Sequence, residues 1–303
     1  MEPLEKKQIL LTGSMGFIGS HLLKKLASKY RVIGINNYLD KKSTNYNPIK
    51  KNITRLKTTD LPDDLHSIIH LAAITDTKYC EQNPQECFKT NVNGTQNLLE
   101  IARKKEVKLV YVSTSHVYGK PKKLPIKEDD PKQPTSIYAS SKLAGEINCM
   151  GYANSYGMDI SIARLFSVYG PHSPSHLVTY RIMSQLRTKN IILGNLKPER
   201  DFIFIDDVVS AIQIILRKTK RFNDYNVGNG KSYSIQKICE IVKKLTNFDT
   251  PINSSNQLLR KNDIQKIVCD PSKLKKIGWK PKVSIFSGLE YTWKEFKKIN
   301  MPK

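Results

Sequence analysis

The stretch QILLTGSMGFIGSHLLKKL, residues 8–26, decides the fold. Its first five residues form an apolar run typical of a buried strand, and from Phe17 to Tyr30 the apolar residues recur at helical spacing. The turn between them is rich in glycine, so its backbone can approach a pyrophosphate, which the free N–H groups and dipole of the helix would bind. The residues of this turn that we assign to a dinucleotide cofactor are Gly13, Met15, Gly16, Phe17, Ile18 and Gly19.

Strand-like and helix-like patterns continue to alternate through the first half of the chain, which is typical of βαβ units and a parallel sheet. The predicted strands are 31–35, 67–71, 108–113 and 159–166, and the predicted helices are 85–105, 137–156, 177–187, 208–216, 235–245 and 286–298. We therefore predict an α/β fold: a Rossmann-type doubly wound parallel sheet with a smaller C-terminal α/β substrate domain. The expected domains are 1–165 and 166–303, with 200–220 crossing back to the first.

Composition excludes several classes of protein. The chain has 303 residues, of which 39% are hydrophobic and 25% charged, and no apolar stretch reaches the ~20 residues of a membrane span. The N-terminus lacks the pattern of a secretory signal. The five cysteines are odd in number and none has C-x-x-C spacing, so neither a disulfide framework nor a zinc site is expected. We expect a reduced, cytoplasmic protein without a membrane partner.

The net charge of +23 raises the question of a nucleic-acid partner. Only 10 of the 50 basic residues are arginine, and the lysines are spread from Lys6 to Lys303 instead of forming one stripe. We therefore expect no nucleic-acid partner. A positive field of this kind would attract an anionic substrate.

The segment Tyr138-Ala-Ser-Ser-Lys142 carries the chemistry. Tyr138 and Lys142, at i and i+4, share one face of a helix. A phenol titrates near 10 and is a poor base unaided, but a nearby ammonium favours the phenolate. Tyr138 can then take a proton from a substrate hydroxyl while a hydride leaves the same carbon, and Lys142 can also hold a hydroxyl of the cofactor.

These motifs together resemble the extended branch of the short-chain dehydrogenase/reductase superfamily. The glycine spacing is G-x-x-G-x-x-G, Leu71-Ala72-Ala73 resembles the cofactor-lining turn, and NVNGT at 91–95 resembles a helix motif of that family. The resemblance implies that Thr114, at the end of a strand, hydrogen-bonds the reacting oxygen. The catalytic residues are thus expected to be Thr114, Tyr138 and Lys142.

The resemblance also implies how the adenosine end of the cofactor is bound. At the end of the second strand the family carries a carboxylate that holds the ribose and repels a 2′-phosphate, whereas this chain has Asn36. Lys41 and Lys42 follow closely, so NAD is expected as cofactor with NADP open. Asp60 and Leu61 stand where the family contacts adenine, although this Asp could equally end a strand.

In the substrate half, the resemblance gives candidate contacts to a nucleotide-sugar. Ser115 and His116 follow Thr114 where dehydratases and decarboxylases of the family carry acids, which argues against both reactions. Ser167 stands at the position of a sugar-contacting Asn, and Arg200 and Arg260 match two phosphate-binding motifs. The substrate-binding residues are expected to be Thr114, Ser115, His116, Ser167, Arg200 and Arg260.

Two further expectations concern metal and assembly. His172 and His176 are four apart, but Pro171 and Pro174 break any helix there, so no metal site is expected. The helices beginning at Gln85 and Ile137 correspond to the pair through which relatives dimerise, which implies a homodimer.

Three hypotheses for the function follow. The first is a nucleotide-diphosphate-sugar 4-epimerase that acts through a transient 4-keto sugar. The second is an NADPH-dependent 4-ketosugar reductase, favoured by Asn36 and by the short stretch before Leu71. The third is a non-catalytic, NADP-sensing or RNA-associated member of the fold, which the intact Thr114, Tyr138 and Lys142 argue against.

Overall fold

The computed structural model describes residues 6–38, 49–259 and 263–300. The chain divides into two compact units. Unit 1 comprises residues 1–119, 132–164 and 211–225, and unit 2 comprises 120–131, 165–210 and 226–303. The division therefore falls after Arg164, residues 211–225 return to unit 1, and the segment 120–131 groups with unit 2 although the sequence suggested no such excursion.

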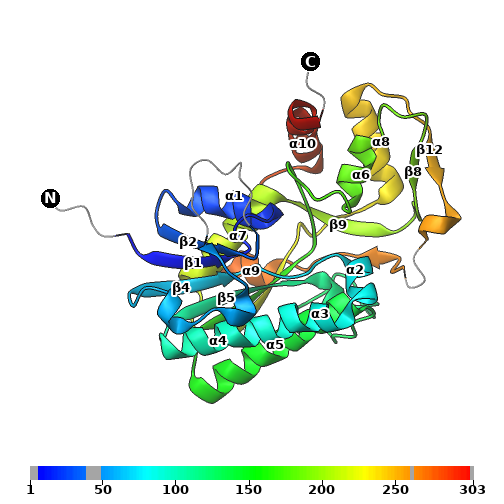
Figure 1. The fold of residues 1–303 in the computed structure, drawn as a ribbon. Coiled ribbons are helices and arrows are strands. Elements are labelled where there is room, and N and C mark those ends of the chain that lie inside the picture. The colour runs from blue at the N-terminus through cyan, green and yellow to red at the C-terminus, as the bar shows by residue number, and fades with distance from the viewer. Residues whose placement is uncertain (1–5, 39–48, 260–262, 301–303) are drawn as a thin grey trace. The chain divides into compact units, whose positions relative to one another are not determined.

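A seven-stranded sheet forms the centre of unit 1, in the order β10-β6-β5-β4-β1-β2-β3 (Figure 1). The pairs β3–β2, β2–β1, β1–β4 and β4–β5 are parallel. Both faces are covered, so β1, β5 and β6 are buried along nearly their whole length. The strands are β1 (Gln8–Thr12), β2 (Arg31–Asn36), β3 (Ile49–Lys50), β4 (Leu65–His70), β5 (Lys108–Thr114), β6 (Ile160–Leu165) and β10 (Asn223–Val227).

Helices cover the two faces of this sheet. The helix α1 lies on one face, and α4 and α5 lie side by side on the other (Figure 1). The expected helix over 85–105 is three consecutive segments, with a turn of π-helix (Lys89–Asn93) between α3 and α4. The elements are α1 (Phe17–Leu26), α2 (Thr77–Gln82), α3 (Pro84–Phe88), α4 (Gly94–Lys104), α5 (Ile137–Tyr156), α7 (Ile205–Lys218) and the short 3₁₀ turns Ile53–Arg55, Thr58–Asp60 and Ser115–Tyr118.

The ends of two helices show how local sequence sets their length. Helix α5 begins after Ser136, whose side chain accepts the N–H of Ala139 at 3.2 Å, and it ends at Gly157 with a φ of 65°. Helix α1 ends at Leu26, four residues before the predicted Tyr30. The chain turns back there to begin β2, where the N–H of Arg31 donates to the carbonyl of Lys7.

The strand order reverses between β1 and β4. From β1 the chain continues to β2 and β3 on one side, whereas β4 is followed by β5 and β6 on the other. Ligands of doubly wound sheets bind outside the carboxyl ends of the strands at such a reversal. In this sheet those ends are Thr12 and His70, which lie opposite each other in register.

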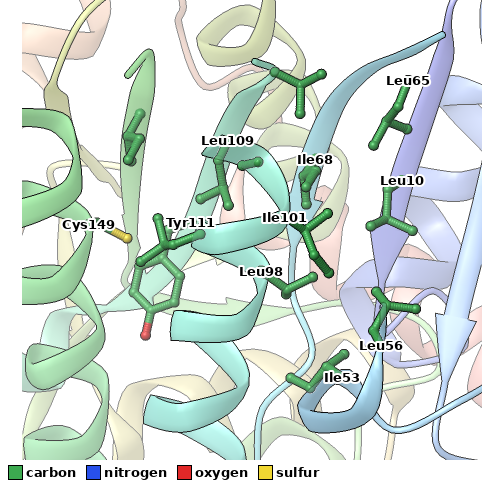
Figure 2. Close-up of a cluster of buried hydrophobic side chains, with 14 of the residues drawn as sticks. Leu10, Ile53, Leu56, Leu65, Ile68, Leu98, Ile101, Leu109, Tyr111 and Cys149 are labelled. Atoms are coloured by element: carbon green, nitrogen blue, oxygen red, sulfur yellow. The ribbon is translucent and has the colours of Figure 1, made fainter. Parts of the chain in front are cut away.

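The core of unit 1 lies between the sheet and helices α4 and α5 (Figure 2). Fully buried side chains from β1, β4, β5 and α4 interlock there, and Cys149 contributes from α5. Fully burying one such aliphatic side chain contributes about 1.5–3 kcal/mol. This core holds α5, and with it the catalytic motif, against the carboxyl end of β5.

Unit 2 is a smaller mixture of sheet and helix. Strand β9 pairs with β7 and β13 in parallel and with β11 in antiparallel fashion, and β8 pairs with β12. Its elements are β7 (Ser167–Tyr169), β8 (Ile191–Leu193), β9 (Glu199–Phe204), β11 (Ser232–Ser234), β12 (Ile252–Ser254), β13 (Lys266–Ile267), α6 (Val178–Ser184), α8 (Ile235–Thr246), α9 (Ser272–Lys276), α10 (Ile285–Asn300) and the 3₁₀ turn Asn256–Leu258. The predicted fold class is confirmed.

Candidate active site

The glycine turn after β1 lies at the reversal of the strand order. Gly13 has a φ of 70°, which favours glycine, and a Cβ there would lie 2.9 Å from the backbone nitrogen of Ala72. At Gly19 a Cβ would lie 2.0 Å from the carbonyl oxygen of Gly13, so α1 packs directly on the turn. The packing of the protein itself therefore requires these two glycines.

Gly16 is different and indicates a ligand. A Cβ at Gly16 would meet only one described atom within 4 Å, the carbonyl oxygen of Gly13 at 3.2 Å. No side chain caps the start of α1 at this residue, so the helix begins with N–H groups that a ligand can accept. An open backbone at a helix N-terminus fits the pyrophosphate of a dinucleotide.

Asn36 ends β2 with its side chain buried against this turn. Its Oδ1 accepts the N–H of Met15 at 3.0 Å, and its Nδ2 donates to Oγ of Ser14 at 2.7 Å. The amide therefore fixes the conformation of the turn, a role that the sequence did not reveal. Its predicted contact with the adenosine ribose stays a prediction, and Lys41 and Lys42 lie outside the described residues.

We expect Asn36→Asp to shift the preference of the protein from NADP toward NAD. A carboxylate can still accept from Met15 and Ser14, but it adds a negative charge where a 2′-phosphate would sit. We expect a repulsion of about 1.4 kcal/mol between the carboxylate and the 2′-phosphate, which is modest for two charges near a protein surface. It corresponds to a tenfold change in the ratio of the dissociation constants for NAD and NADP. Calorimetry with both cofactors measures this ratio. Asn37→Asp, an exposed neighbour, is the control: an equal shift there would mean that position 36 does not face the ribose.

The candidate adenine contacts lie in the turn Thr58–Asp60. The carboxylate of Asp60 accepts the N–H of Lys57 at 2.7 Å and forms an ion pair with Lys51. The side chain of Leu61 is buried in the core, so only its backbone is left for a ligand. The structure thus gives both residues a structural role beside the predicted adenine contact.

His70, which sequence reasoning missed, orders the cofactor-lining turn that follows β4. Burial lowers its pKa well below the usual value, so the ring is neutral. Thr95 donates to the carbonyl of Asn91 at 2.6 Å, so its Oγ must accept from Nε2 of His70 at 3.0 Å. Nδ1 then accepts from Thr12 at 2.8 Å, and the same Thr12 oxygen accepts the N–H of Ala72. The signal in the sequence is a polar residue that ends an apolar strand.

Asn91 holds the next part of this segment. Its side chain accepts the N–H of Ile74 at 2.8 Å and donates to the carbonyl of the same residue at 2.9 Å. It also donates to Oγ of Ser141, which in turn donates to the carbonyl of Tyr138. Asn91 lies in the π-helical turn, a feature that often marks functional sites. The segment after β4 is thereby connected to the helix that carries the catalytic motif.

The structure brings Thr114 and Tyr138 together. The Thr114 side chain hydrogen-bonds the phenol and lowers its pKa, whereas burial has the larger, opposite effect and raises the pKa of Tyr138 to about 12. Oγ of Thr114 already accepts the N–H of His116 at 3.2 Å, so its own proton is left for the phenol oxygen. This arrangement stabilises a phenolate once one forms.

Lys142 lies one turn further along α5 and is 3% exposed. Its Nζ lies 4.0 Å from the centroid of the Tyr111 ring, and burial lowers the pKa of Lys142 to about 8. The ammonium of this buried lysine fits the ribose hydroxyls of a nicotinamide cofactor, which would accept its hydrogen bonds.

The two residues after Thr114 differ in exposure. Ser115 is buried, whereas His116 is exposed and its ring packs edge-on against Tyr138, with 5.9 Å between ring centroids. The structure therefore places an imidazole beside the reactive phenol. The contacts of Ser115 and His116 with substrate stay predictions.

The predicted phosphate contacts lie in unit 2. The guanidinium of Arg200, on β9, donates to Oδ1 of Asp263 and to the carbonyls of Glu199 and Ile264. Part of its donor capacity is therefore used within the protein. Arg260 lies outside the described residues, and Ser167 begins β7 with its side chain half-buried. The substrate roles of all three stay predictions.

The neighbouring Asp201 has a role that the motif alone did not reveal. Its carboxylate is fully buried and accepts the N–H groups of Asn229, Gly230 and Cys269 at 2.7, 2.8 and 3.0 Å. It thus fixes two loops of unit 2 that are far apart in sequence.

Among residues 6–38, 49–259 and 263–300, no group of three His, Cys, Asp or Glu side chains could hold a metal ion. Within the same ranges no helix is long and apolar enough to cross a membrane.

A glycine turn at the reversal of a doubly wound sheet, with a Tyr–Lys pair on the helix beside β5, defines an oxidoreductase of the short-chain dehydrogenase/reductase type. The family model described as GDP-mannose 4,6 dehydratase matches residues 10–292. The chain belongs to this family of extended short-chain dehydrogenase/reductase enzymes that act on nucleotide-sugars.

Three similar proteins show which reactions occur among the relatives of this chain. A putative UDP-glucose 4-epimerase of Methanocaldococcus jannaschii is 32% identical, over 93% of this chain and 96% of its own length. UDP-glucuronic acid decarboxylase 1 of Arabidopsis thaliana is 28% identical, over 97% of this chain and 70% of its own length. The structure of UDP-glucuronic acid 4-epimerase from Bacillus cereus, in complex with UDP-glucuronic acid and NAD, is 28% identical and superposes with a TM-score of 0.89, covering 96% of this chain and 99% of that one.

Proposed function

We propose that this protein is an NAD(P)-dependent 4-epimerase of nucleotide-diphosphate-sugars that acts through a transient 4-keto sugar. The observation that carries the proposal is the grouping of Thr114, Tyr138 and Lys142 at the carboxyl end of β5 and along α5. The named epimerases among its relatives support it. NAD in the Bacillus cereus epimerase supports the cofactor.

The residues of this chain divide the chemistry among them. Tyr138 removes the proton of the sugar 4-hydroxyl and returns it at the end of the reaction. Thr114 donates a hydrogen bond to the reacting oxygens, and Lys142 supplies the positive charge that favours the phenolate. The glycine turn and Lys142 would hold the cofactor, whose nicotinamide, when bound, supplies the reversible hydride acceptor.

Two alternative reactions are open to this family. A decarboxylase is disfavoured because His116 stands where such enzymes carry a Glu. A 4-ketosugar reductase is favoured by one observation, that Asn36 brings no charge against the 2′-phosphate of NADPH.

Cofactor balance separates the two leading reactions. Incubation with a panel of nucleotide-sugars should interconvert a pair of C4 epimers without net consumption of added cofactor. Stoichiometric oxidation of NADPH, with no interconversion in its absence, would replace the epimerase by the reductase. Mass spectrometry of the cofactor that co-purifies with the protein tests the choice of NAD or NADP.

We also propose that the protein is a homodimer that associates through α4 and α5. On α5, Leu143, Ile147 and Met150 are spaced at i, i+4 and i+7, and Ile147 and Met150 are 55% and 45% exposed. Such a stripe on the outer face of a helix marks an interaction surface.

We expect Ile147→Glu to convert the dimer into a monomer, because a carboxylate in an apolar interface loses its hydration. Light scattering over a range of concentrations measures the mass. Ile192→Glu, at a residue of β8 that is 44% exposed, is the matched control and should leave the dimer intact. A monomeric wild type, or a dimer that survives Ile147→Glu, would contradict the proposal.

A further inference from the structure

A third polar residue continues the catalytic stripe of α5. Tyr138, Lys142 and Glu146 follow one another at four-residue spacing, so they lie along one face of the helix. Glu146 is only 4% exposed. A carboxylate at such a position costs free energy unless its oxygens are paired, so its partners show what the position requires.

The partners of Glu146 connect α5 to the ends of two strands. Arg164, at the end of β6, donates from Nε to Oε1 at 3.0 Å and from Nη2 to Oε2 at 2.8 Å. The hydroxyl of Ser113, near the end of β5, donates to Oε1. Nη1 of Arg164 also donates to the Tyr118 hydroxyl at 3.0 Å and pairs with Asp224 at 2.8 Å. The network therefore contacts the chain on both sides of Thr114, at Ser113 and at Tyr118.

The same network sets the charge balance around Lys142. Burial lowers the pKa of Lys142, whereas Cys149, Glu146 and Cys87 raise it. The other titratable groups that face Lys142 are Tyr111 on β5, His70 on β4, Cys87 on α3, and Tyr138 and Cys149 on α5. Burial keeps Tyr111, His70, Tyr138 and Cys149 neutral near pH 7, and Arg164 is positive. Glu146, one helical turn from Lys142, therefore supplies a negative charge beside the ammonium.

We propose that Glu146 is a positioning residue of the reaction: through Arg164 and Ser113 it holds Thr114 and Tyr138 at a fixed separation, and it places a carboxylate one helical turn from Lys142. The inference rests on the proposed role of Tyr138 in proton transfer. It also explains why a buried ion pair occupies this place, where apolar side chains would pack at least as stably.

Glu146→Gln tests both parts. The amide keeps the shape, but it removes the charge and places an NH₂ group opposite the donors of Arg164. We expect kcat to fall about 10- to 100-fold, with KM for the sugar within a factor of two or three of wild type. The pKa of Lys142 is about 8 in the wild type, and the loss of a negative charge beside it would lower this value, so the alkaline limb of the pH profile should move to lower pH.

Conservative variants separate geometry from charge. Glu146→Asp keeps the charge on a shorter arm, so it should restore the alkaline limb while kcat stays reduced. Ser113→Ala removes the contact to β5 alone and should lower kcat several-fold without moving the limb. If Glu146→Gln does not fold, these two variants decide, and wild-type kcat in both would overturn the inference.

A matched control measures the effect of losing any buried carboxylate. Asp207 accepts the N–H groups of Lys282 and Val283 in unit 2, at 2.9 and 3.0 Å. Asp207→Asn should lower Tm without shifting the pH profile. If Glu146→Gln behaves in the same way, the inference is wrong although the proposed function stands. If Tyr138→Phe retains turnover, the proposed function itself fails, whatever the Glu146 variants show.

Discussion

Tyr138→Phe should reduce kcat for sugar interconversion about 10³-fold, within the range of general acid–base catalysis. The substitution removes a single oxygen, so the ring can keep its edge-on contact with His116. It leaves the Thr114 hydroxyl without its partner and the sugar 4-hydroxyl without a proton acceptor.

The measurement is turnover of the nucleotide-sugar that the wild-type enzyme accepts, beside the affinity for the cofactor. We expect the dissociation constant of the cofactor to change less than threefold, because Lys142 and the glycine turn are untouched. Tyr79→Phe is the control: its exposed hydroxyl donates to Glu86, and its loss should change neither value. Near-wild-type turnover in Tyr138→Phe would remove the basis for assigning catalysis to this helix.

Gly19→Ala should have the second large effect, on folding as well as on binding. Its Cβ would lie 2.0 Å from the carbonyl oxygen of Gly13 and 2.9 Å from Cα of Ser14. Both are backbone atoms, which cannot rotate away as a side chain can, so α1 must shift. We expect a loss of about 3 kcal/mol in the free energy of unfolding, the upper part of the usual range for overpacking. The displaced helix should also lower cofactor affinity at least tenfold.

Gly151→Ala provides the control for a glycine in a helix. No described atom lies within 4 Å of a Cβ at this position on α5. Alanine should therefore stabilise the protein by about 0.5–1 kcal/mol, because it lowers the conformational entropy of the unfolded chain. Thermal or urea unfolding of both variants, followed by cofactor titration, measures the contrast. Equal stability of Gly19→Ala and wild type would mean that α1 does not pack on the turn.

Sequence alone was sufficient for the central motif and for most strands and helices of unit 1, but not for β3, α2 or β10. Apolar runs, glycines and helical spacing are local properties, so β1, the glycine turn and α5 could be assigned to within a few residues. The pair Tyr138 and Lys142 could be assigned in the same way because i, i+4 spacing fixes a shared helix face.

The less accurate assignments have a common cause, which is that they depend on contacts between parts of the chain that are distant in sequence. The helix predicted over 85–105 contains a π-helical turn, because Asn91 must reach the backbone of Ile74. Helix α1 stops at Leu26 since β2 must begin beside β1. The partition of 120–131 and 211–225 depends on which residues pack together, which periodicity does not encode.

The sequence by itself determined which chemical groups are available for catalysis: a cofactor turn, a phenol and an ammonium on one helix face, and no acid beside Thr114. The tertiary structure decided which groups support them. Asn36 holds the turn, His70 orders the segment after β4, and Glu146 with Arg164 joins α5 to the ends of β5 and β6. These contacts span 18 to 60 residues, and a buried polar side chain is restricted by its partners in space, which spacing along the chain does not reveal.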